Sequence, residues 1–135
     1  METIRTIYTG DLRTIATHVQ SGIQIMTDAP LDNQGKGEAF SPTDLLAASL
    51  GSCMATVMGI AARKNNLDID GTRIAITKIM ASAPRRVTEI ILEFKMPEKN
   101  SYSGEEKKLL EDVAINCPVA KSLHPDIRQT VSFHY

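Results

Sequence analysis

The pattern of hydrophobic and polar positions divides the first part of the chain into strand-like stretches and one long loop. Residues 2–27 are rich in Thr, Ile and Val, with turn residues at Thr9–Asp11 and at Ser21–Gly22. This pattern predicts a meander of short strands. Residues 28–38 are rich in Pro, Asn and Gly, which predicts a loop. Loops of this length are often functional.

The most apolar stretch of the chain predicts a long helix. Ser41 suits the N-cap, Pro42 suits the first helical position, and Asp44 completes a Ser-x-x-Asp capping box. The helix is expected to continue to about Asn66. Residues 45–62 are apolar on nearly every face, which indicates a helix surrounded by protein. Because the run is marginal for a membrane span, we expect a buried helix at a subunit interface. Four small residues would let another backbone come close: Ala48, Gly51, Ala55 and Gly59.

The second half of the chain alternates strand-like and helix-like patterns. Residues 72–81 and 87–96 are predicted strands, and the second of them alternates apolar and polar positions. A second helix is expected from Ser103, which opens another capping box. A short helical turn from Pro118 and a final strand at residues 127–135 follow. The order of elements predicts an α+β fold.

Composition limits the number of domains and the classes of partner that the protein is expected to have. A length of 135 residues suits a single domain, which we expect to span residues 1–135. A net charge of −1 gives no electrostatic case for nucleic acid or an anionic membrane. Three Phe, three Tyr and no Trp are too few for a base-stacking platform. The N-terminus has no apolar core of the signal-peptide type, so a cytoplasmic protein with reduced thiols is expected.

The two cysteines are the candidates for chemistry. With scattered histidines and no Cys-x-x-Cys, Cys53 and Cys117 cannot form a four-ligand zinc site, so neither a metal nor a cofactor is expected. Each cysteine lies on an apolar helical face, where a packing role is common. A reactive thiolate needs a nearby cation or a helix N-terminus. Cys117 precedes a predicted helical turn, so the local sequence predicts Cys117 as the thiol of lower pKa. Cys53 lies three turns into its helix, and its reactivity would require a basic side chain from elsewhere in the fold.

Two motifs resemble a known family. The stretch SPTDLLAASLGSC, which ends at Cys53, and the stretch INCPVAKSL around Cys117 resemble the OsmC/Ohr family of thiol-dependent peroxidases. The resemblance extends over nearly the whole chain. It implies an intertwined homodimer, in which antiparallel sheets wrap around two long central helices that pack together. Such a dimer would account for a helix that is apolar on all sides.

The resemblance also implies a mechanism. Cys53 matches the peroxidatic cysteine of the family and Cys117 the resolving cysteine. The Cys53 thiolate would attack an organic hydroperoxide and become a sulfenic acid, which would condense with Cys117 to a disulfide. An external dithiol, in this family a dihydrolipoyl group such as that of a lipoylated protein, would reduce the disulfide. The apolar surroundings of Cys53 would receive the alkyl chain of the peroxide.

Three further residues follow from the same resemblance. An arginine from the N-terminal strands contacts the reactive thiol in the peroxidases, and Arg13 matches it by position; the alternative is that Arg13 is a solvated strand residue. Well-characterised members have a glutamate directly after the helix proline, where it orients the arginine. Thr43 occupies that position here, and the acid comes one residue later as Asp44, which the capping box also explains. The form SPTDLL therefore resembles a less characterised OsmC-like branch.

Two other functions remain open at this stage. One is a non-enzymatic OsmC-like dimer that binds an apolar small molecule in an interface pocket, with the cysteines as part of its lining. The other is a thiol redox sensor, for which the sequence offers no DNA-binding segment. A rapid loss of both thiols on addition of peroxide distinguishes the peroxidase from both alternatives.

Overall fold

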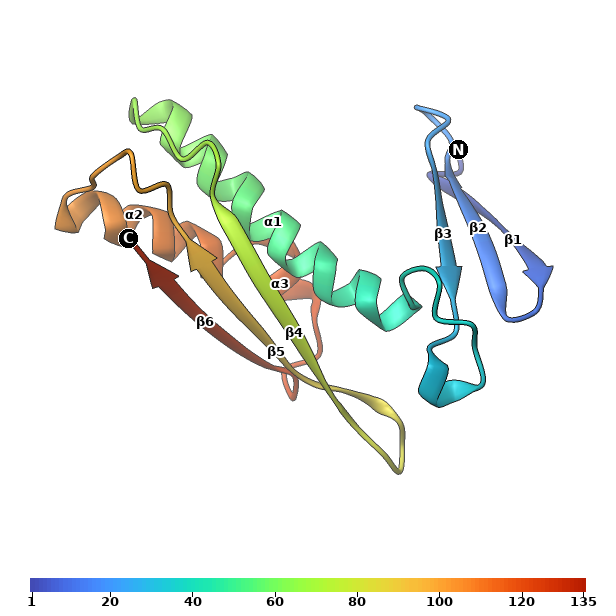
Figure 1. The fold of residues 1–135 in the computed structure, drawn as a ribbon. Coiled ribbons are helices and arrows are strands. Elements are labelled where there is room, and N and C mark those ends of the chain that lie inside the picture. Colours follow the sequence, from blue (N-terminus) through green and yellow to red (C-terminus); the bar gives the residue numbers. More distant parts are fainter. The chain divides into compact units, whose positions relative to one another are not determined.

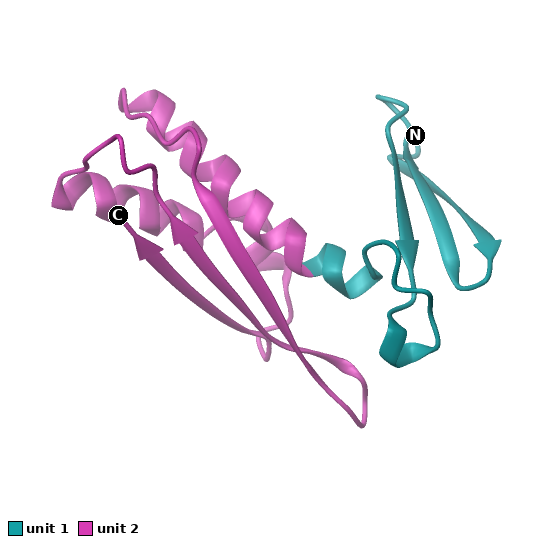
Figure 2. Ribbon diagram, viewed as in Figure 1, with its two compact units in different colours: residues 1–46 teal, residues 47–135 magenta.

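A computed structural model describes all residues, 1–135, and separates them into two compact units, residues 1–46 and residues 47–135 (Figure 2). The α+β composition expected from the sequence is confirmed. The first unit contains β1 (Ile4–Gly10), β2 (Arg13–His18), β3 (Gln24–Asp28) and a short 3-10 helix, Leu31–Asn33 (Figure 1).

The three strands of the first unit form an antiparallel sheet in the order β1-β2-β3, as the predicted meander requires. The loop between β2 and β3 is closed where the His18 N–H donates to the Ile23 carbonyl at 2.8 Å. This register sets Arg13, at the start of β2, directly opposite Asp28, at the end of β3. A side chain that is long and basic therefore lies next to a carboxylate on the neighbouring strand.

Helix α1 (Pro42–Lys64) begins in the first unit and continues through the second. The predicted capping box is confirmed at its start. The Ser41 Oγ accepts the Asp44 N–H at 3.0 Å, and the Asp44 carboxylate accepts the Ser41 N–H at 2.9 Å. These bonds satisfy N–H groups that have no partner within the helix. The helix ends at Lys64, two residues before the predicted end, which is within the usual fraying of helix termini.

The second unit adds a three-stranded sheet in the order β4-β5-β6 and two further helices. Its elements are β4 (Arg73–Ala81), β5 (Arg86–Lys95), α2 (Gly104–Ile115), α3 (Pro118–Ser122) and β6 (Arg128–His134). β4 and β5 are antiparallel, but β5 and β6 are parallel. The expectation of purely antiparallel sheets is wrong for this pair. Because α2 and α3 form a crossover between β5 and β6, the chain returns to the end of the sheet from which β5 started.

The core of the second unit lies between its sheet and its helices. In Figure 1, α1 and α2 cover the same face of the β4-β5-β6 sheet. Alternate residues of β5 point into this core, as their pattern predicted, and they are almost fully buried together with residues of α1 and α2. The set comprises Ile90, Leu92 and Phe94 of β5 and Met96 directly after it, with Leu50, Met54 and Met58 of α1 and Leu110 and Ala114 of α2.

The small residues of α1 do not all serve one purpose. A Cβ atom at Gly51 would lie 2.5 Å from the Ile76 side chain of β4, so this glycine lets α1 approach the sheet of its own chain. A Cβ atom at Gly59 would meet nothing within 4 Å. The helix is long and apolar enough to cross a bilayer by length and composition alone. Its buried residues pack in the core of the second unit, as in the core helix of a globular protein.

Candidate thiol site

Two elements of the second unit position the two cysteines. Cys53 lies in the middle of α1 and is half-buried, whereas Cys117 is the N-cap residue of α3 and is 1% exposed. Both are free thiols. The Cys117 sulfur accepts the Ala120 N–H at 3.4 Å, and the Cys53 thiol lies near enough to Cys117 to influence its pKa. The structure therefore brings together two cysteines that are 64 positions apart in the sequence.

The environment of Cys117 opposes its ionisation. Burial raises the pKa of the Cys117 thiol, and the N–H of Ala120 only partly offsets this effect. The neighbouring Cys53 raises the pKa further. The expectation of a low pKa at Cys117 is wrong, because removal of water outweighs the hydrogen bond at the start of α3. The local sequence indicates the position of the helix start but gives no measure of how deeply the sulfur is buried.

Arg13 forms a network of ion pairs in the first unit. Its Nε and Nη2 atoms donate to the two carboxylate oxygens of Asp28 at 2.6 and 2.8 Å, and Nη2 also donates to Glu38 at 3.1 Å. The hydrogen bonds that Arg13 donates to Asp28 lower the pKa of the Asp28 carboxyl and raise the pKa of the Arg13 guanidinium. Arg13 is thus not a solvated strand residue, since two carboxylates hold its guanidinium.

The sequence did not predict Asp28 and Glu38 as partners of Arg13. Asp28 is 2% exposed, and its carboxylate also accepts the Glu38 N–H at 3.1 Å. A register argument finds the pair only if the turn is placed correctly. In the pairing of β2 with β3, the numbers of two opposite residues always add to 41. The loop between the strands is therefore centred on residues 20 and 21. A turn centred on Ser21–Gly22 would instead set Arg13 opposite Pro30.

Thr43 and Asp44 lie in the first turn of α1. The Thr43 hydroxyl is within 3.2 Å of the Ser41 hydroxyl, and the Asp44 carboxylate caps the helix through the Ser41 N–H. The side chains predicted for the site therefore form two groups in the structure. Cys53 and Cys117 are together in the second unit, while the first unit holds Arg13 with its two carboxylates and contains the capped helix start.

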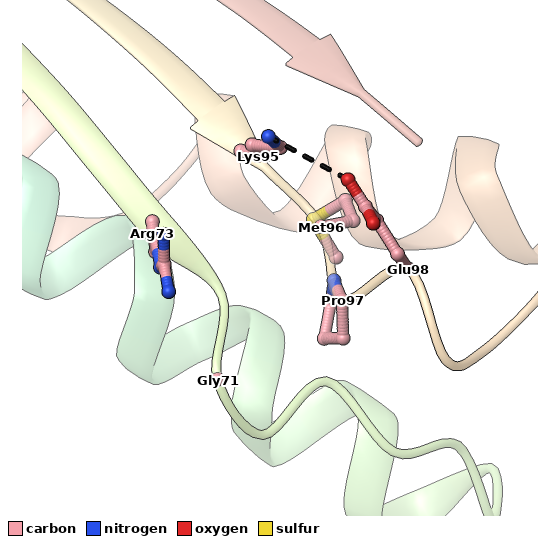
Figure 3. A pocket seen from close by; sticks show the side chains of 6 residues that line it. All are labelled: Gly71, Arg73, Lys95, Met96, Pro97 and Glu98. Atoms are coloured by element: carbon pink, nitrogen blue, oxygen red, sulfur yellow. Dashed lines mark ion pairs between the residues drawn. The ribbon is translucent and has the colours of Figure 1, made fainter.

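A separate cavity of about 240 Å³ lies at the ends of β4 and β5. Its lining includes Arg73, Lys95 and Glu98, and the ammonium group of Lys95 pairs with Glu98 at 3.6 Å (Figure 3). It contains no thiol and none of the residues predicted for the site. No group of three or more His, Cys, Asp or Glu side chains in the chain is arranged to hold a metal ion. The paired thiols remain the strongest candidate for chemistry.

Solved structures resemble this fold closely. A protein from Psychrobacter arcticus 273-4, described as an osmotic stress induced and detoxification response protein, is 53% identical; the TM-score is 0.95, over 99% of this chain and 96% of that chain. The OsmC-like protein of Mycoplasma pneumoniae is 20% identical, with a TM-score of 0.75 over 98% of this chain and 96% of that chain. The organic hydroperoxide resistance protein OsmC of Legionella pneumophila is 14% identical, with a TM-score of 0.77 over 100% and 98%.

The likeness to the Mycoplasma and Legionella structures, at 20% and 14% identity, shows the fold alone. No curated protein sequence matches the chain. The sequence pattern of OsmC-like proteins matches residues 35–132, a range that includes both cysteines. With a match over most of its length and a relative of 53% identity over nearly all of it, the chain belongs to the OsmC-like protein family.

Proposed function

We propose that this protein is a thiol-dependent peroxidase that reduces organic hydroperoxides in the cytoplasm through Cys53 and Cys117. Membership of the OsmC/Ohr family supports a peroxide-related redox role. Two structural relatives, from Legionella pneumophila and Elizabethkingia anophelis, carry the name organic hydroperoxide resistance protein. The observation that carries the proposal is the proximity of two thiols of unequal exposure. The half-buried Cys53 is the one that a substrate reaches, and the buried Cys117 is the one that resolves.

The reaction balances with one peroxide and one dithiol. The Cys53 thiolate attacks the distal oxygen of the hydroperoxide, the O–O bond breaks, and the products are a Cys53 sulfenic acid and an alkoxide that takes up a proton to become the alcohol. The Cys117 sulfur then attacks the Cys53 sulfur and releases water, which leaves a Cys53–Cys117 disulfide. A dithiol reductant, such as a dihydrolipoyl group of a lipoylated protein, exchanges with this disulfide and restores both thiols.

Arg13 has the role of the cation in this proposal. A guanidinium favours the thiolate form of a nearby cysteine and donates hydrogen bonds to a peroxide oxygen. Its Nη1 atom takes part in neither of the ion pairs to Asp28 and Glu38. The two N–H groups of Nη1 can therefore donate hydrogen bonds to the Cys53 sulfur or to a peroxide oxygen. Thr43 and Asp44 belong to the helix start, and the proposal assigns them no proton transfer.

We further propose that the active form is a homodimer. The first unit leaves several large apolar side chains more than 40% exposed, which a monomer rarely tolerates over a contiguous area. On one face of the β1-β2-β3 sheet they are Ile4, Tyr8 and Ile25, and Ile7 lies on the opposite face. Association with a second copy, as the family resemblance implies, would remove this apolar surface from water.

Counting free thiols after addition of peroxide tests the proposed function. With one equivalent of cumene hydroperoxide, the reduced protein is expected to lose two thiols within seconds. In the Cys117→Ser variant one thiol is expected to disappear, with a mass increase of one oxygen on Cys53. Two thiols that persist for many minutes in the parent protein contradict the peroxidase. That result favours the alternative of an apolar binding protein.

The second step of the reaction is expected to depend on pH. Because burial raises the pKa of Cys117, this thiol is largely protonated at pH 7, and the thiolate is the nucleophile in disulfide formation. Below the pKa the thiolate fraction grows about tenfold per pH unit. We expect disulfide formation to accelerate by roughly that factor between pH 7 and pH 8. Acid quenching followed by mass spectrometry measures it, since the chain has no Trp as a fluorescent probe. A rate that is flat with pH contradicts the prediction.

A further inference from the structure

We propose that Asp28 is the positioning residue for Arg13 in the peroxidase reaction. The inference rests on the proposed function, and it assigns to β3 the carboxylate that orients the guanidinium. Thr43 has no carboxylate with which to form a bidentate pair, and the Asp44 carboxylate accepts the Ser41 N–H. The structure instead provides the bidentate partner from the neighbouring strand.

The geometry of the pair fixes the plane of the guanidinium. Nε and Nη2 of Arg13 bind separate oxygens of Asp28, so two parallel hydrogen bonds define both the position and the rotation of the group. Arginine and a carboxylate form such fork-shaped pairs because the spacing of their atoms matches. The Nη1 edge then points away from the carboxylate in a fixed direction. This is the edge that a thiolate or a peroxide oxygen would meet.

Asp28 is itself held rigidly. Its side chain is 2% exposed, and one of its oxygens accepts the Glu38 backbone N–H. The register of β2 and β3 sets its backbone opposite that of Arg13. With little water to compete, the pair retains most of its strength. A carboxylate with a fixed backbone, a fixed side chain and a buried environment is suited to orient a long flexible partner.

Glu38 offers a contrast on the same guanidinium. Its side chain is 64% exposed and makes a single hydrogen bond of 3.1 Å to Nη2. Exposed ion pairs contribute little, because water and salt screen the charges. The difference in burial between the two carboxylates therefore provides a matched pair of substitutions, Asp28→Asn and Glu38→Gln, which each remove one charge from the same network.

The test measures the second-order rate of Cys53 oxidation by cumene hydroperoxide in the parent, the two single variants, Arg13→Ala and the Asp28→Asn/Arg13→Ala double variant. Loss of orientation of a catalytic group costs on the order of 100-fold, so we expect a loss of about 10- to 100-fold for Asp28→Asn. Glu38→Gln is expected to lose less than about fivefold. In the Arg13→Ala background, Asp28→Asn is expected to cause no further loss, because a positioning residue acts only through the group that it positions.

A purely structural role for Asp28 gives a different pattern. It would lower the rate by a similar factor whether or not Arg13 is present, and that result overturns the inference. A parent-like rate for Asp28→Asn also overturns it, while the proposed function stands. A parent protein that does not react with the peroxide overturns the proposed function itself and the inference with it.

A second variant, Arg13→Lys, tests the inference if Asp28→Asn does not fold. If circular dichroism shows that Asp28→Asn is unfolded, Arg13→Lys removes the forked pair while keeping both the charge and Asp28. The same loss of about 10- to 100-fold in Arg13→Lys then supports the inference. A parent-like rate in Arg13→Lys overturns it, because a charge without a fixed orientation would have sufficed.

Discussion

The Cys53→Ser variant is expected to keep its remaining thiol, Cys117, for many minutes after the addition of one equivalent of cumene hydroperoxide. The rate of thiol loss should fall by a factor on the order of 10³ or more, because a neutral hydroxyl is a poor nucleophile at neutral pH. Cys117 cannot take over the first step. It is 1% exposed, and burial raises the pKa of its thiol. Free-thiol titration over time measures the effect.

Cys117→Ser is the matched control for this result, since it also removes one sulfur from the pair. It should still consume one equivalent of peroxide, and its sulfenic acid should persist or oxidise further because no resolving thiol is present. If Cys53→Ser loses its thiol as fast as the parent protein does, the roles of the two cysteines are reversed. Melting curves of both variants should resemble that of the reduced parent.

The Phe94→Ala variant is expected to lower the free energy of unfolding by about 3–5 kcal/mol. Phe94 on β5 is 0% exposed, and its ring stacks on that of Phe133 with 5.0 Å between centroids. The two residues are directly paired in the parallel register of β5 and β6. Truncation leaves a cavity between the sheet and the helices and removes this ring contact. Urea denaturation of the reduced protein measures the change.

Glu93→Ala is the control for this prediction. Glu93 is the preceding residue of the same strand, and its side chain is exposed on the opposite face. Its replacement should change the free energy of unfolding by about 0.5 kcal/mol or less. A loss below about 1 kcal/mol for Phe94→Ala would show that the parallel pair is not part of a tightly packed core.

The sequence predicted the elements of the fold because their signals are local. Ser41 and Ser103 each begin a capping box that the structure contains, and the alternation in β5 identified its buried face. The parallel pairing of β5 and β6 was not predicted. Strand direction depends on how α2 and α3 return the chain, and apolar alternation is the same in either direction.

The candidate site was predictable in its thiols but not in its electrostatics. The family resemblance predicted Cys53 and Cys117 as the reactive pair, and the structure places the two thiols near each other. The raised pKa of Cys117 depends on burial by residues distant in sequence, and local sequence carries no measure of it. Asp28 was not predicted because it ends a strand within a stretch whose composition is typical of a loop. Its pairing with Arg13 also depends on the register of β2 and β3, and a register shifted by two residues would place Pro30 opposite Arg13.

The buried residues of the first unit are all polar, namely Thr27, Asp28 and Ser41. A three-stranded sheet of this size needs an apolar face that is covered before it is stable. Residues 1–46 leave the ribosome before residues 47–135, yet the apolar surface that could cover their sheet has to come from outside this unit. Although the first unit is synthesised before the second, it is therefore expected to acquire a stable structure after it.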